Sequence, residues 1–376
     1  MADRAGRAKP YLALGLMSGT SRDGIDAALV RTDGRHFVEP GETLFLPYDA
    51  AFRAQLAQAV EQARLYGIKT AEDLRDVEKS LTDFHVKAVH KLIEKAVLNS
   101  EAIDLIGFHG HTVYHAPQQR LTWQLGDGQA LCDTTGIAVV GDFRSNDVAQ
   151  GGEGAPLAPA YHKARLSNDD RCCPAVVLNI GGVSNVTWIG ADEEPLLSFD
   201  CGPGNALIDD WILAETGYAF DQGGRIAGAG DVDENIVLQL MSDSFFMQTP
   251  PKSLDRDAFA SEGVRGLSTE DGAATLTAFT LEAIKAAQEH FPRPPQCWYV
   301  TGGGRFNETL MDGLRQQLHG HVTTVESLGW NGDFLEAEAF AYLAVRSVEN
   351  LPLSWPGTTG VSKPVTGGQL FKPRLK

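Results

Sequence analysis

The sequence predicts an α/β fold of two related lobes with a cleft between them, each lobe containing a mixed sheet that begins as an antiparallel hairpin. Three glycine-rich turns, each behind a short apolar strand, carry this prediction: LALGLMSGTSRDGID, VVLNIGGVSN and WYVTGGGRF. The second observation is that a hairpin, a further strand and then alternating helices and strands occur twice in 376 residues, a length suited to two domains. Ligands of open α/β sheets bind at strand ends, which places a nucleotide-sized cleft at the turns.

The first half is expected to open with strands over 11–17, 25–31 and about 42–46. Helices should follow over 51–66 and about 74–98, since the second of these segments has apolar residues at helical spacing. Shorter extended segments are expected over 105–108, 121–125 and 137–140. A Gly/Pro-rich passage over 151–159 and a short helix to about 166 then lead into the second half.

The second half repeats the pattern, with strands expected over 175–180, 183–189 and 196–199. Its remaining segments are predicted as helices over 206–215, 276–290, 307–318 and 334–348, and as strands over 297–300 and 322–325. We therefore expect one lobe from residues 1–150 with about 345–376, and the other from 151–344. The tail over 354–376 either packs on the first lobe or stays mobile.

Composition narrows the function classes. The chain is 43% hydrophobic and 22% charged, as in soluble globular proteins, and its net charge of −17 argues against a general nucleic-acid binder. Five cysteines without a C-x-x-C pair predict reduced thiols. The N-terminal apolar run breaks at Ser18-Gly19, too early for a membrane span. These features predict a cytoplasmic protein without a membrane or nucleic-acid partner.

The first glycine-rich turn offers groups that hold phosphate oxygens. Backbone N–H groups and hydroxyls can bind phosphate, and Asp23 can orient Mg²⁺ through water. An ordinary hairpin turn is the alternative, and the absence of a following lysine excludes a P-loop. The residues that we assign to nucleotide binding here are Gly19, Thr20, Ser21, Arg22, Asp23, Gly24, Ile25 and Asp26.

The other two turns are interpreted in the same way. Gly181 and Gly182 form a second candidate phosphate turn, and Gly302, Gly303 and Gly304 join a strand to a helix, where the backbone can approach a nucleoside. Each alone is explained equally well as a plain turn. Their joint occurrence at lobe-scale spacing favours a nucleotide site.

Asp200 is the strongest candidate for catalysis. It ends an expected strand in SFDCGPGN, ahead of a tight Gly-Pro-Gly turn, and Asn205 is suited to cap the helix that follows. A carboxylate at a strand end, with no cation beside it in sequence, can serve as a general base. The alternative is an aspartate that only accepts backbone N–H bonds in the turn.

Candidate substrate residues lie elsewhere. In GFHGHTVYH, strand alternation would place His109 and His111 on one face, where substrate contact or a strand-end hydrogen bond explains them better than a transition metal. Arg144 could bind a carboxylate in bidentate fashion, or pair with Asp142 or Asp147 at the surface. Glu336, near the start of a late helix, is a further candidate.

Seven segments together resemble the anhydro-N-acetylmuramic acid kinase family, from about residue 11 to about 347. They are GLMSGTSRDGIDAALV, GFHGHTVYH, WQLGDGQAL, GDFRSNDVAQGGEGAPLAP, NIGGVSN, FDCGPGNALIDDW and TGGGRFN. The resemblance implies two actin-like, ribonuclease H-like lobes and an ATP- and Mg²⁺-dependent kinase. Its substrate would be 1,6-anhydro-N-acetylmuramic acid from peptidoglycan, and its product N-acetylmuramic acid 6-phosphate. It further implies a homodimer. Cys201 stands where the family's FD-x-GPGN segment is expected to have threonine.

The resemblance also assigns roles. By its place in FD-x-GPGN, Asp200 would be the base that activates water for attack on C1, because O6 lies in the anhydro bridge and has no proton to lose. Two other interpretations stay open: a kinase of the same architecture acting on a free sugar hydroxyl, and an actin- or Hsp70-like nucleotide switch. The chain shows no peptide-binding module beyond the two lobes, which counts against a chaperone.

Overall fold

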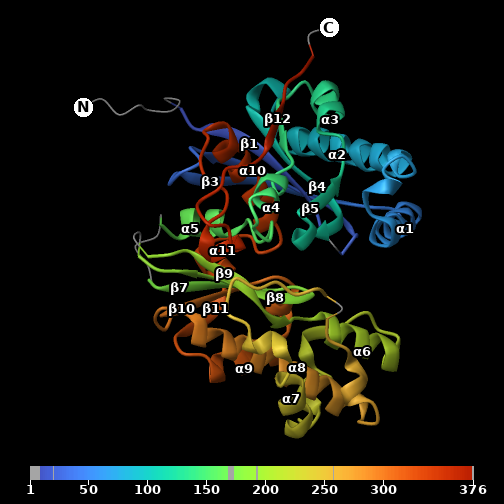
Figure 1. Cartoon of the computed structure of the whole chain (residues 1–376), viewed down its shortest axis with the longest axis vertical. Coiled ribbons are helices and arrows are strands. Elements are labelled where there is room, and N and C mark those ends of the chain that lie inside the picture. The colour runs from blue at the N-terminus through green and yellow to red at the C-terminus, as the bar shows by residue number, and fades with distance from the viewer. Residues whose placement is uncertain (1–8, 20, 168–172, 192–193, 257, 375–376) are drawn as a thin grey trace. The chain divides into compact units, whose positions relative to one another are not determined.

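The computed structural model describes residues 9–19, 21–167, 173–191, 194–256 and 258–374 (Figure 1). The chain divides into two compact units, the first formed by Met1–Asp170 with Phe334–Lys376 and the second by Arg171–Asp333. Residues 151–170 and 334–344, which we expected in the second lobe, fall in the first unit. The reason is that helices α5 (Pro159–Ser167) and α10 (Leu335–Val348) pack on each other, and α10 packs on the sheet of that unit.

The sheet of the first unit begins with an antiparallel meander of β1 (Tyr11–Ser18), β2 (Gly24–Thr32) and β3 (Val38–Pro47). β4 (Leu105–Ala116) is parallel to β1, and β6 (Val139–Gly141) is parallel to β4. β12 (Gln369–Phe371) extends this edge and β5 (Leu121–Leu125) pairs with β4, so the order is β12-β6-β4-β1-β2-β3.

Helices cover both faces of this sheet. Leu14 and Leu16 belong to the core shared with α1 (Ala50–Tyr66), α2 (Arg75–Lys95) and α3 (Gly128–Thr135). α10 lies against the opposite face at two glycines, where its backbone comes so close that a Cβ on Gly15 or Gly107 would lie 1.8 or 2.0 Å from a helix carbonyl oxygen. The close packing of α10 on this face therefore requires glycine at positions 15 and 107.

A buried ion pair joins α10 to α5. Arg165 Nη1 lies 3.0 Å from Glu338 Oε2, and the Tyr161 hydroxyl bonds to both side chains. Two short helices, α4 (Ser145–Ala149) and α11 (Pro356–Thr359), complete the unit with the C-terminal segment. That segment packs on the first unit, as one of the two expectations for it held, and ends as strand β12 along β6.

The second unit repeats the first. β7 (Ala175–Ile180), β8 (Val183–Ile189) and β9 (Leu197–Pro203) form an antiparallel meander. β10 (Cys297–Thr301) and β11 (His321–Thr324) lie parallel to β7, which gives the order β11-β10-β7-β8-β9. In both units the first strand is central, flanked by the meander on one side and by parallel strands on the other. This shared topology confirms the predicted fold of two ribonuclease H-like units, as in actin-like ATPases.

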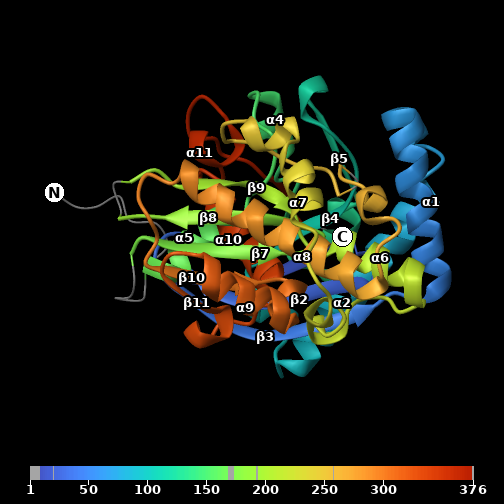
Figure 2. The ribbon, with the colours of Figure 1, turned by 90° about the horizontal axis from the view of Figure 1, so that it is seen from below.

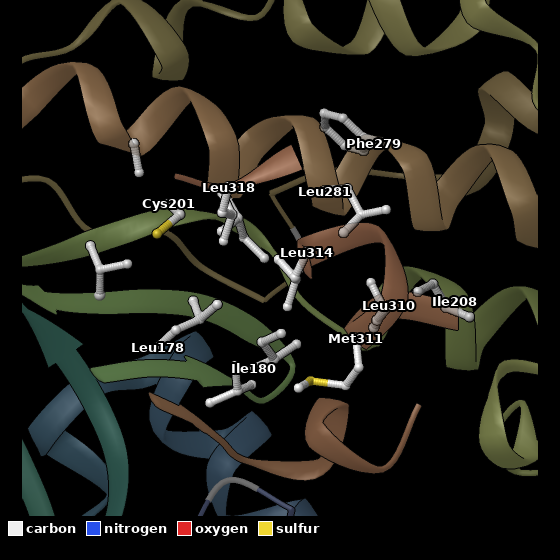
Figure 3. Packing of buried hydrophobic residues seen from close by; sticks show 14 of the residues in the cluster. Leu178, Ile180, Cys201, Ile208, Phe279, Leu281, Leu310, Met311, Leu314 and Leu318 are labelled. Carbon is white, nitrogen blue, oxygen red and sulfur yellow. The ribbon is translucent and has the colours of Figure 1, made fainter. Parts of the chain in front are cut away.

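Helices α6 (Ala206–Thr216), α7 (Glu234–Met241), α8 (Thr269–Ala286) and α9 (Glu308–Gln317) belong to the second unit. In Figure 2, α8 and α9 cross one face of its sheet, which they contact at β9 and β11 respectively. Figure 3 shows side chains of this core, among them Leu178 of β7, Leu281 of α8 and Leu314 of α9. Core residues thus occupy alternate positions of β7 and β9 and leave Asp200 on the other face of the sheet.

Two expectations from composition can be compared with the structure. Cys297 is disulfide-bonded, so the expectation of reduced thiols was wrong for it. Cys132, Cys173 and Cys201 are thiols that take part in no disulfide. None of the helices in the described ranges combines the length and apolar character that a bilayer span requires.

Candidate active site

The Asp200 carboxylate is held at the second unit's sheet, opposite Asn185 of β8. Its Oδ2 accepts a hydrogen bond from the Leu254 N–H at 2.8 Å, and its own N–H donates to the Lys252 carbonyl at 3.0 Å. Burial raises the pKa of Asp200 to about 7, with the bond from Leu254 and the charge of Lys252 opposing the rise. A carboxylate that titrates near neutral pH is suited to proton abstraction.

Lys252 is a neighbour of Asp200 that sequence reasoning missed, because it lies 52 positions along the chain from it in a segment without regular structure. Its ammonium donates to the Phe245 carbonyl at 3.2 Å and lies 4.4 Å from the centre of the Phe245 ring. Burial lowers its pKa, and Asp200 and Cys201 oppose that change. No cation stands beside Asp200 in the sequence, but the fold brings the Lys252 ammonium close enough to act on the Asp200 carboxylate.

The glycine turns of the second unit meet at the ends of β7 and β10. Gly204 and Asn205 donate backbone bonds of 2.9 and 2.7 Å to the carbonyls of Gly182 and Gly181. A Cβ on Gly204 would lie 2.3 Å from the Gly181 oxygen, so only glycine permits this approach. Asn205 precedes α6 as predicted, but its side chain makes no helix cap. It donates instead to the Ile180 carbonyl at 3.1 Å.

The Gly302–Gly304 turn joins the same cluster. Gly302 has φ +77°, and a Cβ on it would lie 2.4 Å from Asn179 Oδ1 and 2.5 Å from the Ile180 oxygen. Gly303 is exposed, and a Cβ there would have as its nearest neighbour Asn205 Nδ2 at 3.5 Å, an ordinary contact. Three sequence-distant glycine segments thus form one backbone-lined surface with room above Gly303.

Arg305 fixes the position of this turn, and sequence reasoning missed it. The buried guanidinium donates to the Gly302 carbonyl at 2.9 Å, to Glu326 at 2.9 Å and to Asp333 at 2.6 Å. These charge-assisted bonds give the Gly302–Gly304 backbone a defined position.

The first unit carries the turn between β1 and β2. Arg22 adopts the left-handed conformation with φ +55° and its N–H donates to the Gly19 carbonyl at 3.1 Å. Ser21 donates to Asp23 Oδ1 at 2.6 Å, and both side chains are exposed. Thr20 lies outside the described residues. Hydroxyl, carboxylate and backbone groups are therefore presented at the surface of this turn.

The remaining residues of the first turn are built into the sheet. Gly24 lies under β3, where a Cβ would meet the Leu46 oxygen at 2.5 Å, and Ile25 is fully buried in the core. Asp26 is half-buried and pairs in register with Met17 and Phe45. Gly24 and Ile25 can reach a ligand only through their backbone.

A β-bulge separates the two histidines of β4. Leu16 pairs with Phe108 but Ser18 pairs with His111, so β4 has one extra residue there, at Gly110 with φ +73°. The expectation that His109 and His111 share a face was therefore wrong. His109 contacts Phe340 of α10, with ring centres 4.6 Å apart.

His111 instead points toward the core that the first unit's sheet shares with α1, α2 and α3. Its Nδ1 lies 3.0 Å from the Ser18 hydroxyl, which lies 2.8 Å from the Tyr48 hydroxyl. Burial, and then the charge of Arg22, lowers the pKa of His111 to about 4, so its ring is neutral at pH 7. This buried chain of three side chains anchors the last residue of β1, directly before the Gly19 turn.

Arg144 and His109 are joined by hydrogen bonds between their side chains. The Gly110 carbonyl can only accept, so His109 Nδ1 carries the ring proton and donates to it at 2.9 Å. His109 Nε2 then accepts from Arg144 Nε at 3.1 Å and Nη2 at 2.9 Å, while Arg144 Nη1 donates to the Gly154 carbonyl at 2.8 Å. The alternative, an ion pair with Asp142 or Asp147, is not formed between these described residues.

Glu336, in the first turn of α10, acts electrostatically on Arg144. Its side chain is exposed to solvent, yet protein surrounds it densely enough to raise its pKa, and the charge of Arg144 partly opposes this. The structure thus places three of the predicted substrate residues, Arg144, His109 and Glu336, in one neighbourhood and His111 on the other face of the sheet.

Comparison with known proteins shows to which family the chain belongs. The family model described as anhydro-N-acetylmuramic acid kinase matches residues 11–373. Proteins of that name from Rhizorhabdus wittichii and Zymomonas mobilis are each 48% identical over 363 residues, which is 96% of this chain and 99% of each relative. The chain belongs to the anhydro-N-acetylmuramic acid kinase family. This membership confirms the resemblance and the expected enzyme class, a phosphotransferase.

Two solved structures that align with most of this chain share little of its sequence. Component A of the (R)-2-hydroxyglutaryl-CoA dehydratase of Acidaminococcus fermentans has a TM-score of 0.48 at 11% identity, covering 90% of this chain and 99% of that one. A ROK family glucokinase from Streptomyces griseus has a TM-score of 0.39 at 16% identity, covering 89% and 99%.

Proposed function

We propose that this kinase uses ATP to phosphorylate 1,6-anhydro-N-acetylmuramic acid while water opens the anhydro ring, giving N-acetylmuramic acid 6-phosphate and ADP. The observation that carries the ring-opening step is the Asp200 carboxylate, whose pKa of about 7 suits a base at neutral pH. It lies in the FD-x-GPGN segment, whose Gly204 and Asn205 bond to the Gly181-Gly182 turn.

The chemistry follows from the substrate. O6 is bonded to C1 and carries no hydrogen, so a base cannot activate it directly. Asp200 instead takes a proton from water as the water oxygen bonds to C1 and the C1–O6 bond breaks. The electron pair of that bond stays on O6, which attacks the γ-phosphorus of ATP as the bond to the ADP oxygen breaks. Attack opposite the bridge inverts C1, by the logic of inverting glycosidases.

The nucleotide would be bound by the glycine turns. In this proposal the ATP phosphates meet the turn over Gly19–Asp26 in the first unit and Gly181-Gly182 in the second, and the nucleoside meets Gly302–Gly304. Backbone N–H groups bind phosphate without needing positive side chains, which fits a chain with net charge −17. Arg144 would bind the carboxylate of the sugar, with Glu336 on the same substrate side and His109 acting through Arg144. His111, which we had expected beside His109, bonds to Ser18 on the other face and is not part of this proposal.

Mg²⁺ would bind by way of water. Within the described ranges no three carboxylate, histidine or cysteine side chains converge as a metal site. The exposed Asp23 uses one oxygen to accept from Ser21, and its other oxygen can accept from a metal-bound water, the arrangement that Mg²⁺ favours with phosphates. When bound, Mg²⁺ would neutralise charge on the transferred phosphoryl group.

We further propose that the enzyme works in the cytoplasm as a homodimer, in the recovery of cell-wall sugars. Membership of the family supports the role in sugar recovery and the dimer, and the composition of the chain supports the cytoplasm.

The substrate assignment predicts that the enzyme consumes ATP with 1,6-anhydro-N-acetylmuramic acid and much less with N-acetylmuramic acid, whose O6 is a free hydroxyl. The expected ratio of kcat/KM is about 100 or more, because water addition at C1 is part of the same transition state. Coupled ADP release with each sugar measures it. A preference for the free sugar would favour an ordinary sugar kinase, and ATP binding without turnover on either would favour a nucleotide switch.

A further inference from the structure

The C-terminal segment bonds to a buried carboxylate behind Arg144. Asp147 of α4 is 2% exposed. Its Oδ2 accepts from the Ser354 hydroxyl and, at 2.6 Å, from the Thr359 hydroxyl, and its Oδ1 accepts from the Gly154 N–H at 2.7 Å. A carboxylate this deeply buried is tolerated because both of its oxygens are hydrogen-bonded. Two of its three donors come from residues more than 200 positions away.

Asp147 and the C-terminal segment hold the loop after α4 from two sides. The Gly152 N–H donates to the Asp147 carbonyl at 2.9 Å, and the Glu153 N–H donates to the Thr359 carbonyl at 2.7 Å. A Cβ on Gly152 would lie 2.2 Å from Asp147 Oδ1, so the loop backbone lies directly against the carboxylate. The position of Gly154 is thereby set by the contacts of Asp147 and Thr359.

Gly154 in turn orients Arg144. A guanidinium has five N–H donors, and here Nε and one hydrogen of Nη2 go to His109 while one hydrogen of Nη1 goes to the Gly154 carbonyl. Among the contacts between described residues, one N–H remains on each of Nη1 and Nη2, and these are donors that a carboxylate can accept. Any shift of the Gly154 carbonyl would rotate these donors.

We propose that Ser354 and Thr359 are positioning residues, which act through Asp147 and Gly154 to aim the open edge of Arg144 at the carboxylate of the sugar. This inference rests on the proposed function for its substrate. It gives the C-terminal segment a role in the site. The hydroxyls of this segment complete the hydrogen bonds of Asp147, and Asp147 in turn holds the loop after α4.

The test compares Thr359→Val, which keeps the side-chain shape but loses the hydroxyl, with Thr359→Ser, which keeps the hydroxyl. Thr135→Val is the matched control, because Thr135 is a buried threonine of α3 whose hydroxyl donates to the Leu131 carbonyl, away from Asp147. We expect Thr359→Val to lower kcat/KM for the anhydro sugar by about 10- to 100-fold, mainly through KM, with the KM for ATP within about twofold. Thr359→Ser should stay close to wild type.

A second readout needs no substrate. Amide hydrogen exchange over residues 151–157 should be faster in Thr359→Val than in wild type, and unchanged in Thr135→Val. Equal kcat/KM for the sugar in Thr359→Val and Thr135→Val, or unchanged exchange over that loop, would overturn the inference. If the wild-type enzyme does not phosphorylate the anhydro sugar, the proposed function fails, while faster loop exchange would still support the positioning role and unchanged exchange would refute it.

Discussion

Asp200→Asn should lose turnover of the anhydro sugar by about 10³-fold or more and still bind ATP, because general-base catalysis contributes about 10²–10⁴-fold. Asparagine has nearly the same shape and its amide oxygen can still accept the Leu254 N–H bond. What it lacks is the ability to take a proton from water. Steady-state kinetics and calorimetric titration with a nonhydrolysable ATP analogue would measure the two properties.

The pH dependence supplies the control. In wild type, kcat/KM should fall by about tenfold per pH unit below the Asp200 pKa of about 7, and the residual activity of Asp200→Asn should lack this limb. Stability should respond in the opposite sense. Because the pKa of Asp200 in the folded protein exceeds its ordinary value of 3.8, the group contributes stability below about pH 4, and this contribution is lost as pH rises through about 7. At pH 8 the asparagine variant should therefore melt no lower than wild type.

Two outcomes would count against Asp200 as the base. Near-normal turnover in the asparagine variant would remove it from the proton transfer. A variant that melts well below wild type at pH 8 would show instead that the carboxylate is needed for folding, as in the alternative of a turn aspartate.

Gly302→Ala should destabilise the second unit and abolish ATP binding. The residue has φ +77°, and its new Cβ would lie within 2.6 Å of both Asn179 Oδ1 and the Ile180 oxygen, of which the latter is backbone and cannot turn aside. Strain of this kind costs on the order of 1–3 kcal/mol before the clash is counted. We expect a lower melting temperature and no saturable ATP binding.

Gly303→Ala distinguishes an effect on nucleotide binding from an effect on stability. Its nearest neighbour would be Asn205 Nδ2 at 3.5 Å and its φ is not in the left-handed region, so the melting temperature should barely change. If a nucleoside occupies the exposed space above Gly303, the added methyl group should still raise the KM for ATP by about tenfold or more. An unchanged KM for ATP in Gly303→Ala would argue against a nucleotide at this turn.

The sequence predicted the topology well because both meanders and most helices are set by local patterns. Apolar strands ending in glycine, and apolar spacing such as that of Leu81, Ala88 and Leu92 in α2, depend on near neighbours in the chain. β12 escaped prediction because three residues gain strand geometry only by pairing with β6. The extra residues of the first unit, α5 and the start of α10, were misplaced because packing between distant helices decides where a unit ends.

In the candidate site, too, local patterns could be predicted and contacts between distant residues could not. Glycines whose Cβ would clash, such as Gly204 and Gly302, could be selected from their motifs, and so could Asp200. Lys252 and Arg305 could not, because Asp200 lies 52 positions from Lys252 and the carboxylates that bind Arg305 lie 21 and 28 positions from it. Their own neighbours in the chain carry no pattern. The opposite orientations of His109 and His111 depend on one bulge residue, Gly110, which simple alternation does not anticipate.

The most direct test of the central claim is to run the reaction in H₂¹⁸O with ATP, Mg²⁺ and 1,6-anhydro-N-acetylmuramic acid, and to analyse the product promptly by mass spectrometry. We expect a sugar 6-phosphate with one ¹⁸O at C1 and none in the phosphoryl group, because water opens the ring and O6 receives the phosphate. Phosphorylated product without ¹⁸O at C1, corrected for exchange at the free anomeric centre, would contradict it.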